Sequence, residues 1–359
     1  MQAKYLLALN AHEKIGGQTI KKVLAAFDEN VENFWKATDH EIKQKLGDKI
    51  ADLAIESRKL YDPDREIEKL GKLDIGYMTM YDKCYPELLL EIPDHPAVLY
   101  IKGNIDSLKK PGIGVVGSRK YSRYGQSVAD KLTKQCSESG LTIISGLALG
   151  IDAIAHRAAL ESNGITIGVL GCGLDTIYPI SNSNLAREMI EKGGAVISEF
   201  PPGTPPLKFN FPARNRIIAG LSLGVLVIEA AEQSGALITA YEALDYNREV
   251  FAVPGNIDQE NSKGTNILIQ KGAKLVLEAE DILNELNIET KNIENKSKEI
   301  FPESKDEKII QEILRAGEES VDNIIEKSKL NIIALNTTLT MMEMKGMVEN
   351  VGGGRYKLR

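Results

Sequence analysis

Hydrophobic positions in the middle of the chain come in short runs, separated by segments long enough to form helices. The runs occupy 98–101, 113–116, 142–144, 165–170, 195–197, 224–228, 250–253 and 274–276. Runs of this kind are typical of strands buried on both faces, with helices as parallel crossovers. We therefore expect a doubly wound, mostly parallel α/β sheet. Ligands of such sheets bind outside the carboxyl ends of the strands, so the residues after each run are the first candidates for function.

The first 70 residues have a different pattern, in which apolar residues recur at helical spacing. Tyr5, Leu6 and Leu9 form one such group, and a second follows the glycine-containing break at 15–19. Two helices around a glycine turn form either an ordinary helical hairpin or a helix-hairpin-helix (SAM-like) unit, whose turn amides hold a DNA phosphate. We expect a small N-terminal helical domain over residues 1–72.

The C-terminal part begins after a stretch rich in Asn, Lys, Glu and Ser, which is typical of a linker. We place this linker at 287–304, between the sheet domain at 73–286 and a last domain at 305–359. That last domain contains three short helical patterns and a glycine-rich hairpin, which together predict a winged helix. Its third helix, at 331–344, carries no Lys or Arg. Because a winged helix that reads DNA needs bases there, a protein-contact role is at least as well supported.

Composition narrows the functional classes. The 359 residues include 44 bases and 51 acids, a net charge of −7, which argues against a uniformly basic nucleic-acid-binding surface. The three cysteines lie far apart and form no C-x-x-C, so neither a disulfide scaffold nor a cysteine-rich zinc site is expected. No apolar stretch reaches the length of a membrane span, and the apolar start is too short for a signal peptide. We expect a cytoplasmic protein without metal or other cofactor.

Acidic residues are nevertheless absent from two windows that flank predicted strand ends. No Asp or Glu occurs from Ser107 to Ala129, which holds five bases, or from Phe200 to Ile228, which holds three. A basic pocket can therefore form on an acidic protein and attract phosphates locally.

Two strand ends offer small residues and backbone amides. One strand ends in Gly117, Ser118 and Arg119, just before a helix that we expect from about Ser122. Amides at such a turn bind anions, and an arginine adds a bidentate grip or a stacking plane. The G-x-G-x-x-G pattern at 112–117 is not a dinucleotide fingerprint, because the predicted strand lies inside it instead of before it. The next strand ends in Ser145 and Gly146, where we expect free amides.

The segment 199–216 is the most informative part of the chain. Four prolines stiffen a loop that brings Lys208, Phe209 and Phe211 together, and Arg214 and Asn215 follow at the start of a helix. Aromatic rings beside cations form a platform for single-stranded nucleic acid, because rings stack on bases while cations follow the backbone. The alternative, in which a phenylalanine fills the core and the arginines form structural ion pairs, is open for single residues but not for the whole segment.

Other candidate chemistry is weaker. Asp152 and His156 have the spacing of a helical metal pair, but without an evident third ligand a capping or core role is favoured. Cys172 has no histidine nearby in sequence to act as its base. Glu229 is the candidate carboxylate of a nucleotide hydrolase, although no partner acid is placed beside it. Gly-Lys-Ser and Gly-Lys-Thr are absent, which excludes a P-loop.

Taken together, these motifs resemble the DprA/Smf family of DNA-processing proteins. The resemblance rests on Gly114–Arg119, Ser145–His156, Gly168–Pro179, Phe211–Ser222, Ser234–Ala240 and Val253–Gly255, in this order. It covers residues 75 to 280 and implies a Rossmann-like fold that binds single-stranded DNA without catalysis. It also implies a homodimer that protects incoming DNA and loads the RecA recombinase onto it during natural transformation.

The resemblance also implies which residues form the DNA pocket. One alternative function, that of an enzyme, stays open beside it. The pocket would consist of Gly117, Ser118, Arg119, Ser145, Gly146, Lys208, Phe211, Arg214 and Asn215. Phe211 is preferred to Phe209 for stacking because it directly precedes Pro212, as in the family pattern. The rival is a Rossmann-like hydrolase related to phosphoribohydrolases, in which Arg119 holds a phosphate and Glu229 is catalytic.

Overall fold

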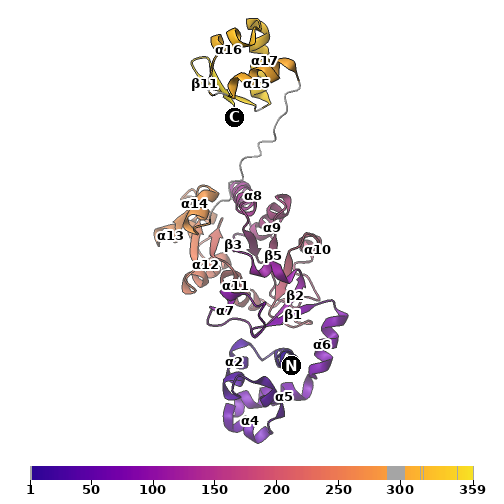
Figure 1. Cartoon of the computed structure of the whole chain (residues 1–359). Coiled ribbons are helices and arrows are strands. Elements are labelled where there is room, and N and C mark those ends of the chain that lie inside the picture. The colour runs from indigo at the N-terminus through magenta and orange to yellow at the C-terminus, as the bar shows by residue number, and fades with distance from the viewer. Residues whose placement is uncertain (1, 289–303, 316, 318, 346, 359) are drawn as a thin grey trace. The chain divides into compact units, whose positions relative to one another are not determined.

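The computed structural model describes residues 2–288 and 304–358, apart from 316, 318 and 346 (Figure 1). The chain divides into two compact units, Met1–Glu289 and Thr290–Arg359, and each is described by itself. Most of the linker expected at 287–304 lies outside the described residues, so the three boundaries between the expected segments remain predictions.

The first unit begins with the expected helices. Asn30, Thr38 and Asp62 cap three of them by accepting hydrogen bonds from first-turn amides. Their apolar faces form a core that continues into the sheet, where the Asn10 amide donates to the Tyr100 hydroxyl at 3.2 Å. The helices are α1 (Ala3–Asn10), α2 (Gly17–Ala26), α3 (Val31–Lys36), α4 (Asp39–Leu46), α5 (Asp48–Leu60) and α6 (Pro63–Lys72).

A nine-stranded sheet forms the centre of the first unit and confirms the predicted α/β architecture. Its order is β1-β2-β6-β5-β4-β3-β7-β8-β9, parallel from β6 to β9 along this order and antiparallel at the β1–β2 and β2–β6 pairs. All eight predicted runs are strands. The strands are β1 (Gly76–Thr79), β2 (Val98–Gly103), β3 (Gly112–Val116), β4 (Thr142–Ser145), β5 (Thr166–Val169), β6 (Ala195–Ser198), β7 (Gly224–Val227), β8 (Glu249–Ala252) and β9 (Lys274–Leu275).

Two details of the sheet differ from the prediction. Strand β1 was not predicted, because it is an edge strand of four residues with only its second half buried. Strand β2 runs antiparallel to both of its neighbours, β1 and β6. The chain between β1 and β2 holds the short helix α7 (Glu87–Leu90).

Helices cover both faces of the sheet, because successive side chains of a strand point to opposite faces and are apolar on both. Ile113 and Val115 pack in one core with α8 and α9, whereas Val116 packs in the other with α11 and α12. The remaining helices of this unit are α8 (Arg123–Glu138), α9 (Ile151–Glu161), α10 (Ser183–Glu191), α11 (Asn210–Leu221), α12 (Gly235–Asp245), α13 (Glu260–Gln270) and α14 (Ala279–Glu285).

The strand order contains one topological switch. From β3 the chain builds outward through β4, β5 and β6, and then returns through α11 to place β7 on the other side of β3. Connections therefore leave β3 and β7 in opposite directions, which opens a crevice at their carboxyl ends.

The second unit is a winged helix, as predicted. Its core contains Ile310, Ile324, Leu335, Leu339 and Met342, from all three helices. The wing turns at two glycines, 353 and 354, whose φ angles of 59° and 70° suit a tight hairpin and favour glycine. The elements are α15 (Lys305–Leu314), β10 (Glu319–Ser320), α16 (Val321–Ser328), α17 (Ile332–Met344), β11 (Val348–Gly352) and β12 (Arg355–Leu358). Among the helices described in either unit, none combines the length and apolarity of a membrane span.

Candidate nucleic-acid interface

A cleft of about 1030 Å³ lies at the carboxyl ends of β3 and β7. Three segments line it: the turn after β3, the stretch from Pro206 into α11, and the turn that leads from β7 into α12. Both acid-free windows of the sequence therefore contribute to one cleft. Seven of the nine predicted site residues line it, namely Gly117, Ser118, Arg119, Lys208, Phe211, Arg214 and Asn215.

The turn after β3 holds Arg119 at the edge of the cleft. A Cβ at Gly117 would lie 2.7 Å from Cγ1 of Ile151, so glycine lets this backbone approach α9 closely. The Ser118 carbonyl accepts from the Ile151 amide at 3.3 Å, and the Ser118 hydroxyl accepts from the Lys120 amide at 3.0 Å. Arg119 itself is exposed and makes no hydrogen bond or ion pair with any described residue, so its donors are available to a ligand.

Phe211 lies between an aromatic ring and a cation. Its ring centroid is 5.6 Å from that of Tyr178, and the guanidinium carbon of Arg119 lies 5.8 Å from the same ring. A Cβ at position 171 would come within 3.1 Å of the Phe211 ring, so Gly171 leaves space for it. Phe209, by contrast, is 70% exposed and does not line the cleft.

Sequence reasoning missed Tyr178, which is 43% exposed and lines the cleft. The available signal was its place in the Gly168–Pro179 motif, shortly after the end of a predicted strand. We call Arg119, Phe211 and Tyr178 the stacking cluster.

The start of α12 forms another wall of the cleft. Ser234 caps this helix by accepting from the Ala236 amide at 3.3 Å, and Asn215 donates to the Gly235 carbonyl at 3.3 Å. Lys208 is exposed and also lines the cleft. The cleft therefore combines a helix N-terminus with exposed cations, an arrangement that favours anions.

Two predicted residues, Ser145 and Gly146, do not line the cleft. The Ser145 hydroxyl is buried and donates to the Val115 carbonyl at 2.6 Å. The expectation of a free amide at Gly146 is wrong, because this amide donates to Oδ2 of Asp152 at 3.1 Å. Asp152 lies in the first turn of α9 and also accepts from the Ala148 amide. Its buried carboxylate therefore holds the loop between β4 and α9 in place.

Arg214 explains why position 146 is glycine. Its guanidinium is buried and donates to the carbonyls of Gly146, at 2.7 Å, and Val169. A Cβ on residue 146 would collide with this guanidinium. Burial lowers the pKa of Arg214 to about 10, against the opposing charge of Asp152, so the group is a cation at neutral pH beneath the cleft.

Arg216 forms structural ion pairs. The sequence left this role open for single arginines of the segment 199–216. It forms two hydrogen bonds with the Glu199 carboxylate, at 2.7 and 2.6 Å, and lies 3.1 Å from the Asp94 carboxylate.

The favoured core role of His156 is confirmed. Its Nδ1 lies 2.6 Å from the Thr166 hydroxyl, and burial lowers its pKa to about 3. Cys172 is buried, which raises its pKa to about 11 and leaves little nucleophilic thiolate at neutral pH. Among the residues that the structure describes, no group of three or more His, Cys, Asp or Glu side chains is placed to hold a metal ion.

Glu229 does not line the cleft that Arg119 lines. Its carboxylate accepts from the amide of Ser122, at 2.9 Å, and from the Ser122 hydroxyl, and so stabilises the N-terminus of α8. It borders a cavity of about 680 Å³ together with Tyr124, and this cavity adjoins the cleft, because Glu260 and Asn261 line both. The hydrogen bonds to Ser122 give Glu229 a structural role, which disfavours its joint use with Arg119 on one phosphate-bearing substrate.

Comparisons with known proteins agree with this architecture. Residues 76–287 match the family model of DNA recombination-mediator protein A, and residues 294–354 match that of the DprA winged helix domain. Protein Smf of Synechocystis is 36% identical over 99% of this chain and 98% of its own length. The crystal structure of DNA processing protein A from Streptococcus pneumoniae superposes with a TM-score of 0.69 and 40% identity, covering 79% of this chain and 97% of that chain.

A second solved structure concerns the single-stranded DNA binding mode of DNA processing protein A from Helicobacter pylori. It superposes with a TM-score of 0.53 and 31% identity, and covers 59% of this chain and 95% of that chain.

Proposed function

Because this chain belongs to the family of DNA recombination-mediator protein A, the DprA/Smf family, we propose that it binds single-stranded DNA and loads a RecA-type recombinase onto it. The protein would act without catalysis, as a homodimer in the cytoplasm, and would protect incoming strands during natural transformation. The relative from Helicobacter pylori, described for its single-stranded DNA binding mode, supports the choice of ligand.

The stacking cluster is the observation that carries this proposal. Tyr178 and Phe211 present aromatic rings at a cleft in which Arg119 makes no hydrogen bond or ion pair with a described residue. Base faces are available for stacking in a single strand, whereas they are covered by neighbouring base pairs in a duplex. Ring stacking accepts every base, so the binding should tolerate any sequence.

The basic residues of the cleft would bind the phosphates of the strand, while the aromatic rings stack on its bases. Arg119, Lys120 and Lys208 are exposed at its rim, and the start of α12 adds backbone donors. These groups suit phosphates, which explains how a protein with a net charge of −7 would hold a polyanion locally.

A binding titration with labelled oligothymidylate, single-stranded and duplex, across a salt series tests the proposal. We expect a salt-sensitive preference for the single strand. Arg119→Ala should lower the affinity and reduce the salt slope by about 0.7, the value for one phosphate contact with a single strand.

Lys110→Ala is the matched control, because exposed Lys110 precedes β3 whereas Arg119 follows it, at the opposite end of the strand. Equal binding of both DNA forms, or no effect of Arg119→Ala, would contradict the proposal. Release of free base from nucleoside monophosphates would instead favour the hydrolase.

Recombinase loading needs its own measurement. We expect this protein to accelerate strand exchange by RecA on DNA already covered with single-strand-binding protein, and Arg119→Ala to abolish the acceleration. Tight DNA binding without any acceleration would restrict the function to strand protection.

A further inference from the structure

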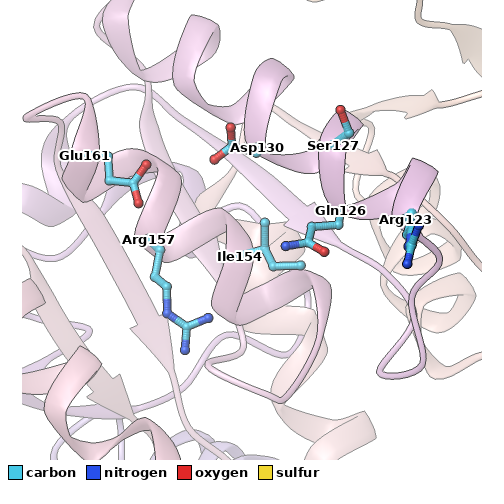
Figure 2. A pocket seen from close by; sticks show the side chains of 7 residues that line it. All are labelled: Arg123, Gln126, Ser127, Asp130, Ile154, Arg157 and Glu161. Carbon is cyan, nitrogen blue, oxygen red and sulfur yellow. The ribbon is translucent and has the colours of Figure 1, made fainter.

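We infer that the groove between α8 and α9 binds the phosphate backbone of the same DNA strand where it leaves the cleft. This inference rests on the proposed function and extends its site by a second, separate contact surface. The groove has a volume of about 380 Å³, and its floor contains the apolar side chain of Ile154 (Figure 2).

Two arginines in this groove have unused donors. Figure 2 shows Arg123 at the beginning of α8 and Arg157 on α9, on opposite sides of Ile154. Both are exposed, and neither makes a hydrogen bond or ion pair with another described residue. Gln126 and Ser127 line the same groove with side chains that are equally free of partners in the described structure.

The acids of the groove are already paired with another base. Lys134 lies 3.0 Å from Asp130 on its own helix and 2.7 Å from Glu161 on α9. Glu161 is therefore bound to Lys134, although it stands at the i+4 position where it would otherwise partner Arg157. These ion pairs with Lys134 leave the two arginines to an external anion.

The near end of the groove adjoins the cleft along the chain. Helix α8 begins three residues after Lys120, and α9 begins three residues after Ala148, and both of these residues line the cleft. The two helices pack against each other, so the groove between them begins close to the cleft. A strand leaving the cleft past Arg119 meets Arg123 next.

The length of the groove limits what it can bind. Seven residues separate Ile154 from Glu161, which is about 10 Å of helix. A groove of this length can hold only a few phosphates of a single strand. We expect phosphate contacts here and no base stacking, because the groove has no aromatic lining residue among those described.

The test compares a short oligothymidylate, just long enough to show binding that depends on Arg119, with one several nucleotides longer. The variant is Arg123→Gln/Arg157→Gln, which keeps two polar side chains and removes two charges. With the long oligonucleotide, the salt slope should fall by about 1.4, the value for two lost contacts with a single strand. Between 50 and 200 mM salt, the variant should therefore lose about sevenfold less affinity than the parent protein.

With the short oligonucleotide, the slope should be unchanged. Arg187→Gln is the control, because Arg187 is exposed on α10 and has no described partner, but lies outside the groove. An unchanged slope with the long oligonucleotide would overturn the groove while leaving the cleft intact. An equal fall of the salt slope with both oligonucleotides would also overturn it, because the arginines would then act through long-range electrostatics and not by direct contact with the strand. A parent protein that binds no single-stranded DNA would overturn both proposals.

Discussion

At the scale of single residues, the cleft separates side chains that face a ligand from side chains that hold the cleft in shape. Arg119 and Arg214 are both arginines of the predicted site, yet among the described residues only Arg119 lacks a hydrogen-bond or ion-pair partner. Arg214 is buried, donates to two carbonyl groups and requires glycine at position 146. We therefore expect loss of Arg119 to affect binding, whereas loss of Arg214 would primarily affect folding, because two buried carbonyl groups would lose their hydrogen-bond donor.

Phe211→Ala should weaken binding of single-stranded oligothymidylate by roughly 1–3 kcal/mol, because one stacking surface is lost. The salt slope should stay the same, since no charge is removed. Isothermal titration at several salt concentrations measures both quantities.

Phe209→Ala is a matched control for this prediction, since Phe209 lies two residues away but outside the cleft. A larger effect of Phe209→Ala than of Phe211→Ala would contradict the prediction, because Phe209 would then be the ring that stacks on a base.

At the scale of elements, the packing of α9 on β5 depends on an uncharged histidine. The Thr166 hydroxyl donates to the Ile143 carbonyl and therefore accepts from Nδ1 of His156. The other ring nitrogen, Nε2, is buried without a partner among the described residues, so a proton there would be an uncompensated charge. Burial and the nearby Arg214 and Arg157 lower the pKa of His156 to about 3.

This contact predicts a loss of stability in acid. Between pH 6.5 and about 3 the unfolded chain binds a proton at His156 that the folded protein does not. The free energy of unfolding should then fall as pH falls, by about 1.4 kcal/mol per pH unit below 6.5.

Urea denaturation at pH 7 and pH 5 measures this contribution. Between these values His156→Gln should lose about 2 kcal/mol less than the parent protein. The same substitution at exposed His40 is the control. If the free energy of unfolding had the same pH dependence in His156→Gln and in the parent protein, His156 would not be held in its neutral form.

At the scale of the whole molecule, the first unit contains its own cores and the entire cleft. The second unit has a separate core, and its helix α17 carries no basic residue. The groove between α8 and α9 also belongs entirely to the first unit. DNA binding, as proposed, therefore needs nothing from the winged helix.

A protein ending at residue 289 should thus fold and bind oligothymidylate within about 0.5 kcal/mol of the full chain, as expected for independent parts. Its salt slope should be unchanged. Fluorescence anisotropy provides the comparison, with thermal unfolding as the control for folding. A collapse of binding in a folded truncated protein would place the DNA site in the winged helix or in the linker.

The sequence alone determined the class of fold, because buried parallel strands leave apolar runs that local patterns reveal. All eight predicted runs are strands, and the glycine-rich hairpin of the winged helix was equally evident. Strand β1 escaped prediction because an edge strand buries too few residues to leave a pattern. The antiparallel direction of β2 depends on how the chain returns to the sheet, which no local pattern encodes.

The sequence also determined which segments carry the candidate site, because missing acids and clustered aromatics are properties of composition. Only the tertiary structure decided which of these residues meet a ligand. Ser145, Gly146 and Arg214 belong to the same predicted pocket as the exposed Arg119, yet their polar groups are used inside the protein. Tyr178 joins Phe211 from 33 positions away, through the packing of a loop against α11. Hydrogen-bond satisfaction and ring contact are long-range properties, and they exist only once the chain has folded.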